Sequence, residues 1–211
     1  MIPEPPTLLL ASQSPRRREL LAAADIAFKL APPEWLVDDT DLHAGSVQPR
    51  HWAAALAYLK AAGTARKIER AADPSGTPRH PWVILGADTV VVRDHELFGK
   101  ARDADDARRI IRALSAGEHE VITGVCLLDA CSGARRLFSD TTIVHVGTIP
   151  DAEVDAYVAS GRWAGKAGAY NLEDRRAAGW PITCIGDPTT VVGLPMVRLL
   201  PLLARHRARA S

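Results

Sequence analysis

The chain lacks the features that define several common classes of protein. It has 3 cysteines in 211 residues and no CxxC pair, so neither a disulfide framework nor a structural zinc site is expected. Its 7 histidines form no HxH or HxxxH pair, which argues against a metal site built from histidine. No apolar run approaches the ~18 residues of a membrane span or forms the core of a secretory signal. A cytosolic protein is therefore expected.

Excess charge of either sign is also absent. There are 26 Lys and Arg residues against 25 Asp and Glu, for a formal net charge of +1. A nucleic-acid surface or a polybasic membrane anchor normally unbalances that count, so neither partner is expected. Any binding of phosphate must come from cations that gather locally. We expect a single globular domain over residues 1–211, in two lobes, with the second lobe around residues 120–150.

Strand-like segments alternate with helical patterns, which predicts an α/β fold. Strands are expected at about 7–11, 26–32 and 82–92, followed by a two-stranded ribbon over 120–147 that turns near Ser132 and Gly133. Helices are expected at about 14–24, 51–70, 103–117 and 151–161. A glycine-rich stretch over 167–187 leads into a strand, and a terminal helix over 195–210 is interrupted by Pro201.

Three consecutive arginines begin at Arg16, in "LASQSPRRREL". Ser14 is the expected N-cap and Pro15 the first helical residue, so the cations lie where the helix macrodipole is positive. Charge runs of this kind usually face solvent. An anion bound at the junction would also explain them, because backbone N–H groups and forked guanidinium donors match phosphate oxygens. Ser12 and Ser14 could add hydroxyl donors.

Asp88 lies in "ILGADTVVV", an apolar, β-branched run that predicts a buried central strand. An ionised carboxylate there is unfavourable unless it is paired or bound to a metal. Asp88 is therefore a candidate general base or a ligand of a hard cation. Gly86 would let a substrate approach the backbone closely. The structural alternative is a carboxylate that bonds to nearby backbone at the end of a strand.

Three lysines and an acidic pair complete the candidates. Lys60 lies on an alanine-rich helix, and Lys100 and Lys166 each adjoin a glycine, which permits close approach of a ligand. No GxxxxGK[ST] motif occurs, so a P-loop ATPase is not expected. Asp38 and Asp39, in "VDDT", form either a site for a divalent cation or a solvated acidic turn.

Taken in order, these segments resemble the Maf (septum formation inhibitor-like) family of nucleoside triphosphate pyrophosphatases. The resemblance spans nearly the whole chain through "LASQSPRRRELL", "VDDT", the lysine of "LKAAGTA", "LGADTVVV", "GKARDADDARRIIRALSAGEHEVITGV", "GKAGAYNLE" and "IGDPTTVVGLP". It implies an α/β fold similar to inosine triphosphatases, with a mixed central sheet flanked by helices, a cleft between two lobes, and frequent dimers. It also implies hydrolysis of a nucleoside triphosphate to the monophosphate and pyrophosphate, with a divalent metal. Magnesium is the usual metal, with manganese or cobalt as alternatives.

The resemblance also assigns roles to individual residues. Asp88 would accept the proton of the attacking water, with Lys60 and Lys100 beside it at the catalytic centre. Asp39 and Asp88 would bind the metal. The family usually has Asp-Glu where this chain has Asp38-Asp39, so ligation through a water is an alternative to direct ligation by Asp39. The phosphates would be bound by Ser12, Arg16, Arg17 and Lys166.

Three positions track the preferred base in the family, and they are Arg16, Thr89 and Glu173 in this chain. The branch that hydrolyses dTTP and UTP typically has Arg, Thr and Gln, whereas the 7-methyl-GTP branch has Glu at the third position. An ionised Glu173 can only accept hydrogen bonds, which suits a base edge with two donors, as on guanine. We lean to the pyrimidine triphosphates, and both substrates stay open. A nucleotide-sensing regulator of cell division with little catalysis is the alternative from another class.

Overall fold

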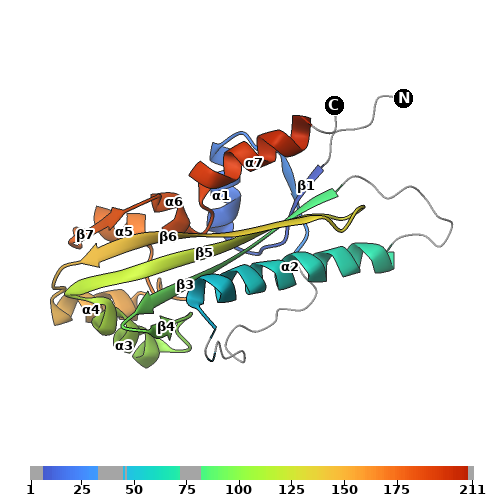
Figure 1. Cartoon of the computed structure of the whole chain (residues 1–211). Coiled ribbons are helices and arrows are strands. Elements are labelled where there is room, and N and C mark those ends of the chain that lie inside the picture. The colour runs from blue at the N-terminus through green and yellow to red at the C-terminus, as the bar shows by residue number, and fades with distance from the viewer. Residues whose placement is uncertain (1–6, 33–44, 46, 72–81, 209–211) are drawn as a thin grey trace.

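The computed structural model describes residues 7–32, 45, 47–71 and 82–208. Its centre is a mixed seven-stranded sheet in the order β2-β1-β3-β5-β6-β7, with β4 paired to β3 (Figure 1). β1 runs parallel to β2 and β3, and the remaining pairs are antiparallel. This confirms the predicted α/β class. The strands are β1 (Thr7–Leu10), β2 (Phe28–Leu30), β3 (Trp82–Arg93), β4 (Glu96–Phe98), β5 (Gly117–Asp129), β6 (Arg135–Val146) and β7 (Ile182–Ile185).

Helices cover both faces of the sheet. On one face α2 (Pro49–Ala71) runs along β3 and β5, and on the other lie α1 (Pro15–Ala23) and α7 (Met196–Ala208) (Figure 1). The shorter helices gather toward the far end of the sheet: α3 (Ala104–Leu114), α4 (Asp151–Ala159), α5 (Leu172–Ala177) and α6 (Pro188–Val192). Within the described ranges, no helix combines the length and the apolar character that crossing a bilayer requires.

Most predicted elements are present within a few residues of their expected bounds, including Ser14 as the N-cap of α1 and the ribbon, whose two strands are β5 and β6. The ribbon belongs to the same sheet as β3, and the division into two lobes stays a prediction. β4, α5 and α6 were not predicted, because segments of three to six residues carry little periodicity. α7 continues through Pro201, where an interruption was predicted. Pro201 has no backbone N–H to donate to the carbonyl of Val197. Because Val197 is exposed, water can supply that hydrogen bond instead.

The side chains of β3 alternate between two parts of the core. Leu85 and Ala87 pack with the cluster formed by α1 and α7, whereas Ile84 packs with buried alanines of α2. Because successive side chains of a strand point to opposite faces, Asp88 faces α2 and Thr89 faces α1 and α6. The strand therefore presents two candidate site residues on opposite faces of the sheet.

α2 approaches the sheet closely at two glycines. A Cβ at Gly86 would lie 2.2 Å from the carbonyl oxygen of Ala57, and one at Gly124 would lie 2.2 Å from the carbonyl carbon of Ala53. Ala53, Ala57 and Ala61 are fully buried at four-residue spacing, so α2 presents a ridge of methyl groups to the sheet. The prediction that Gly86 admits a substrate is therefore wrong, because α2 occupies that space.

Replacing Gly124 by alanine tests this packing. Gly124→Ala is expected to lower the free energy of unfolding by about 1–3 kcal/mol, because the new methyl group would overlap the backbone of α2. In a chain of this size each kcal/mol corresponds to roughly 2–4 °C in Tm, which thermal unfolding followed by circular dichroism measures. The control is Gly99→Ala, whose Cβ would meet no atom within 4 Å. Equal stability of the two variants would contradict the close approach of α2.

Candidate active site

The candidate site lies where one edge of β3 is interrupted. β1 pairs with β3 over Trp82–Leu85, and β4 pairs with it over Val91–Arg93. Between these segments, no strand of the described part of the chain pairs with residues 86–90 on this edge. Asp88 and Thr89 lie in this gap. Side chains from both faces of the sheet can therefore reach the same opening.

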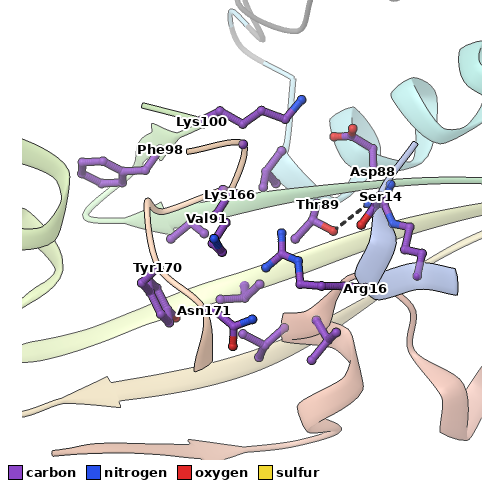
Figure 2. A pocket seen from close by; sticks show the side chains of 18 of the residues that line it. Ser14, Arg16, Asp88, Thr89, Val91, Phe98, Lys100, Lys166, Tyr170 and Asn171 are labelled. Atoms are coloured by element: carbon purple, nitrogen blue, oxygen red, sulfur yellow. Dashed lines mark hydrogen bonds between the residues drawn. The ribbon is translucent and has the colours of Figure 1, made fainter. Parts of the chain in front are cut away.

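A cavity of about 1210 Å³ is formed at the gap (Figure 2). Typical small-molecule sites measure roughly 300–1,000 Å³, so this cavity has room for a nucleotide. Glu173 is not among the lining residues, and Asp38 and Asp39 lie outside the described residues. The structure brings the other predicted site residues together in the lining: Ser12, Arg16, Arg17, Lys60, Asp88, Thr89, Lys100 and Lys166.

Asp88 is paired with Lys60. Asp88 is only 3% exposed, and its Oδ1 accepts a hydrogen bond from Nζ of Lys60 on α2. The pair satisfies the requirement that a buried carboxylate have a cation beside it. The close approach of α2 to Gly86, two residues before Asp88 on the same face, makes this contact reachable for a lysine side chain.

Arg16 points into the cavity, where Figure 2 shows it between Thr89, Lys166 and Asn171. Burial lowers the pKa of its guanidinium, and the negative charge of Asp174 opposes that shift. The group is half-buried at the junction of β1 and α1, as an anion-binding arginine would be. Arg18 is exposed.

Arg17 makes its hydrogen bonds within the protein. It is 8% exposed, and its Nε donates to the Gly193 carbonyl at 2.8 Å. Nη1 donates to Oγ of Ser12 at 3.2 Å, and Nη2 donates to Oγ1 of Thr89 at 3.1 Å. Arg17 therefore positions Ser12 and Thr89, while direct contact with phosphate stays a prediction.

The hydroxyl group of Thr89 belongs to a chain of hydrogen bonds. Oγ1 of Thr123 donates to the Thr190 carbonyl at 2.7 Å, which uses the only hydroxyl proton of Thr123. The 2.9 Å bond between the two threonine hydroxyls must then have Thr89 as its donor. Because that proton is engaged, Thr89 can offer a ligand only an acceptor.

Lys100 and Lys166 are brought together by pairing between two loops. Lys100 and Ala167 form an isolated antiparallel bridge, and the Gly168 N–H donates to the Gly99 carbonyl at 3.0 Å. Nζ of Lys166 donates to the carbonyl of Arg162. Burial lowers the pKa of Lys166, and the positive charge of Arg16 lowers it further. Lys100 is exposed, and both lysines line the cavity (Figure 2).

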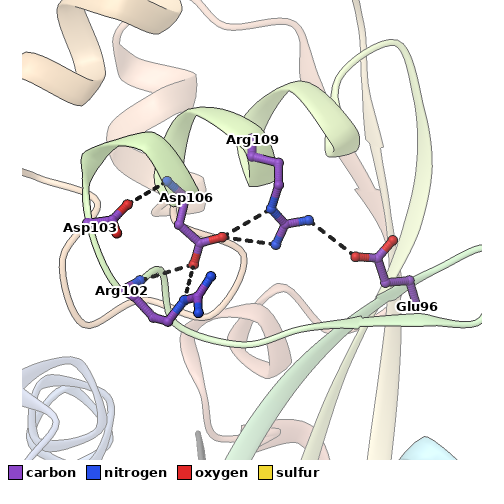
Figure 3. A network of polar contacts seen from close by, with 5 residues as sticks. All are labelled: Glu96, Arg102, Asp103, Asp106 and Arg109. Atoms are coloured by element: carbon purple, nitrogen blue, oxygen red, sulfur yellow. Dashed lines mark hydrogen bonds and ion pairs between the residues drawn. The ribbon is translucent and has the colours of Figure 1, made fainter.

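A network on α3 also reaches the cavity and was not predicted (Figure 3). Asp106 accepts hydrogen bonds from the backbone of Arg102 at 3.1 Å and from Nη2 of Arg109 at 3.0 Å. Burial would raise the pKa of Asp106, but these hydrogen bonds hold it below its ordinary value. Nη1 of Arg109 also donates to Glu96 at 3.3 Å. The sequence contains no sign of this network, because an acidic residue in the first turn of a helix is already explained by the helix macrodipole.

The short helix α5 contributes two further lining residues, Asn171 and Asp174. Asn171 is its N-cap, and the acids that follow are typical of a helix start, which is the sequence signal for this element. Glu173 lies between them but is 66% exposed, with Oε1 3.5 Å from Nη1 of Arg176. Contact between Glu173 and the nucleotide base stays a prediction, and the position of Glu173 outside the cavity lining does not favour it.

The family model described as "Maf-like protein" matches residues 7–206. A protein named dTTP/UTP pyrophosphatase from Alkaliphilus metalliredigens is 38% identical over 200 residues, which cover 94% of this chain and 95% of the relative. A protein of the same name from Salinibacter ruber is 40% identical over 194 residues, covering 91% of this chain and 87% of the relative. These matches agree with the order of the segments that resemble the family, and the chain belongs to the Maf-like protein family.

Proposed function

We propose that this protein hydrolyses a nucleoside triphosphate between its α and β phosphates, with dTTP and UTP as preferred substrates. The observation that carries the proposal is the buried Lys60–Asp88 pair in a cavity that also holds Arg16, Lys100 and Lys166. A triphosphate is the kind of anionic ligand that such a group of cations binds. The name shared by the relatives supports the reaction and the choice of pyrimidine.

In this reaction Asp88 accepts a proton from water. The water oxygen bonds to the α-phosphorus, the bond from that phosphorus to the bridging oxygen breaks, and pyrophosphate leaves. Lys60 holds the carboxylate of Asp88 in place. Arg16, Lys100 and Lys166 stabilise the negative charge that develops on the phosphate oxygens, which is the largest contribution in many such sites.

A divalent metal, with magnesium preferred over manganese or cobalt, completes the proposal. Within the described residues no group of three or more His, Cys, Asp or Glu side chains forms a complete metal site. Magnesium in nucleotide enzymes is commonly held by one or two carboxylates together with phosphate oxygens, and Asp88 fits that pattern. Asp88 and Asp39 would hold the ion, which neutralises phosphate charge when bound.

The products of a nucleotide panel test the proposed function. With magnesium present, UTP and dTTP are expected to yield the monophosphate and pyrophosphate, detected by anion-exchange chromatography and a pyrophosphate assay. The same assay of 7-methyl-GTP and GTP tests the alternative substrate. Orthophosphate as the first product would identify a phosphatase instead. No turnover of any triphosphate would refute the enzymatic proposal.

Asp88→Asn removes the proton acceptor. Turnover of UTP is expected to fall by about 10² or more, because that is the usual contribution of a general base, while binding of UTP is retained. Steady-state kinetics and equilibrium binding measure the two effects.

The matched control for this variant is Asp105→Asn, which changes an exposed carboxylate of α3 that pairs with Arg108 at the surface. It is expected to keep normal turnover. Because Asp88→Asn removes the negative charge beside Lys60, circular dichroism must first establish that the variant is folded. Near-normal turnover by a folded Asp88→Asn protein would show that another group accepts the proton.

Removal of divalent metal is expected to abolish turnover, and added magnesium to restore it. Asp39→Asn is expected to raise the magnesium concentration for half-maximal turnover by about tenfold or more, as loss of a metal-orienting group typically does. Titration of EDTA-treated protein with magnesium measures both effects. Full activity in excess EDTA would contradict the role of a metal.

A further inference from the structure

Two polar side chains at the start of α5 line the cavity, at positions to which the family resemblance assigns no role in specificity. Asn171 and Asp174 both line the cavity, whereas Glu173 lies outside the lining and near Arg176. Asn171 is the N-cap of α5 and Asp174 lies in its first turn, and both line the cavity, whereas Glu173 is rotated by about 100° from Asp174 along the helix. These placements select Asn171 and Asp174 as residues that can contact a ligand.

The cap of α5 determines which atoms Asn171 offers. Its Oδ1 accepts a hydrogen bond from the backbone N–H of Asp174 at 3.1 Å. The amide oxygen is engaged in this contact, so the free end of the side chain is the NH₂ group, a donor of two hydrogen bonds. Figure 2 shows Asn171 beside Arg16 and Tyr170 at one end of the cavity.

Asp174 adds an acceptor at the same end. Burial lowers the pKa of both Arg16 and Lys166, and the negative charge of Asp174 opposes the shift in each. Its carboxylate therefore faces the same region of the cavity as these two cations. Unlike Asp88, the exposed Asp174 has no close ion pair among the described contacts.

The walls at this end are apolar. Tyr170 and Val91, which Figure 2 shows near Asn171, line the cavity. Small-molecule sites commonly combine apolar walls with a few polar groups that fix orientation. A carboxylate repels phosphate but accepts an N–H, so Asp174 suits the heterocyclic base of a nucleotide, while the nearby cations Arg16 and Lys166 suit its phosphates.

We propose that Asp174 and Asn171 read the base: Asp174 accepts a hydrogen bond from a ring N–H, and Asn171 donates one to the adjacent carbonyl. This inference rests on the proposed function. Uracil and thymine present N3–H beside a carbonyl, and guanine presents N1–H beside one. Cytosine and adenine have a lone pair at the corresponding ring nitrogen, which the carboxylate repels. The pair selects bases with a carbonyl and an adjacent ring N–H.

The decisive substrate is 3-methyluridine triphosphate, which keeps both carbonyls of UTP but lacks the N3–H. The native protein is expected to show a kcat/KM about 10- to 100-fold higher for UTP than for the methylated analogue, the usual effect of a hydrogen bond to a charged group. In Asp174→Ala, which has no side-chain acceptor, this ratio is expected to fall toward one, and kcat/KM for CTP to rise because the repelling carboxylate is removed. GTP is assayed in parallel, because guanine also presents a ring N–H beside a carbonyl. Turnover of GTP would show that the site accepts any base with this pair of groups, and its absence would show selectivity for uracil and thymine.

Two further variants separate the roles. Asn171→Ser keeps a good helix cap but removes the amide donors, so it is expected to lower kcat/KM for UTP and 3-methyl-UTP by similar factors. Asp155→Asn is the matched control. It changes an exposed carboxylate of α4 paired with Arg108, and is expected to leave the ratio of UTP to its analogue unchanged.

Three results would overturn the inference: a native protein that does not distinguish UTP from its analogue, a folded Asp174→Ala variant that keeps the native ratio, or loss of the ratio in Glu173→Gln instead. The same comparison by equilibrium binding of UTP and 3-methyl-UTP does not require turnover. A protein that binds UTP selectively without hydrolysing it would therefore refute the proposed function and leave the reading of the base intact.

Discussion

A carboxylate buried in a central strand requires a cation beside it, and the packing of α2 on the sheet supplies that cation. The partner of Asp88 is Lys60, carried by a helix on one face of the sheet. Removing one member of such a pair typically costs about 3–5 kcal/mol, so the helix and the strand must hold a fixed distance. Glycines at 86 and 124 and the alanine ridge of α2 set that distance. Small residues in the core therefore support the charge pair at the site.

The interrupted edge of β3 explains how one cavity gathers groups from both sides of a sheet. In a continuous sheet, Asp88 and Thr89 would lie on faces separated by paired backbone. Because neither β1 nor β4 covers residues 86–90, Lys60 arrives from the α2 face and Arg16 from the α1 face. The bridge between Lys100 and Ala167 places two further lysines, Lys100 and Lys166, at the same opening. The site is thus a property of the strand pairing as much as of its side chains.

The sequence predicted the elements around the site better than the contacts within it. β1 and β3 have strong apolar patterns, α1 has a clear cap at Ser14, and the need of Asp88 for a cation follows from burial alone. That the cation is Lys60 depends on the register of α2 against β3, which no local pattern encodes. Arg17 was assigned a role in phosphate binding by the family resemblance. Its bond to the carbonyl of Gly193 joins residues 176 apart and could not be read from its neighbours.

Glu173 illustrates a different limit. Its predicted role came from an aligned position, but alignment does not specify which face of a short helix meets a cavity. One step along α5 rotates a side chain by about 100°, enough to exchange Glu173 for Asp174. Asn171 gave a usable signal, since asparagine before a run of acids is typical of a helix start. A prediction of α5 from this signal would have indicated that Glu173 and Asp174 point in different directions.

The hydrogen bonds of Arg17 have a consequence for the order of folding. They join α1, near the start of the chain, to β3 and to the turn at Gly193, near its end. During synthesis, which proceeds from the amino terminus, β1 and β3 can pair long before residue 193 is available. Contacts so distant in sequence also form slowly. A nascent chain can therefore acquire most of its sheet while Ser12 and Thr89 still lack their final support, and the candidate site is completed only when the carboxyl-terminal segment docks.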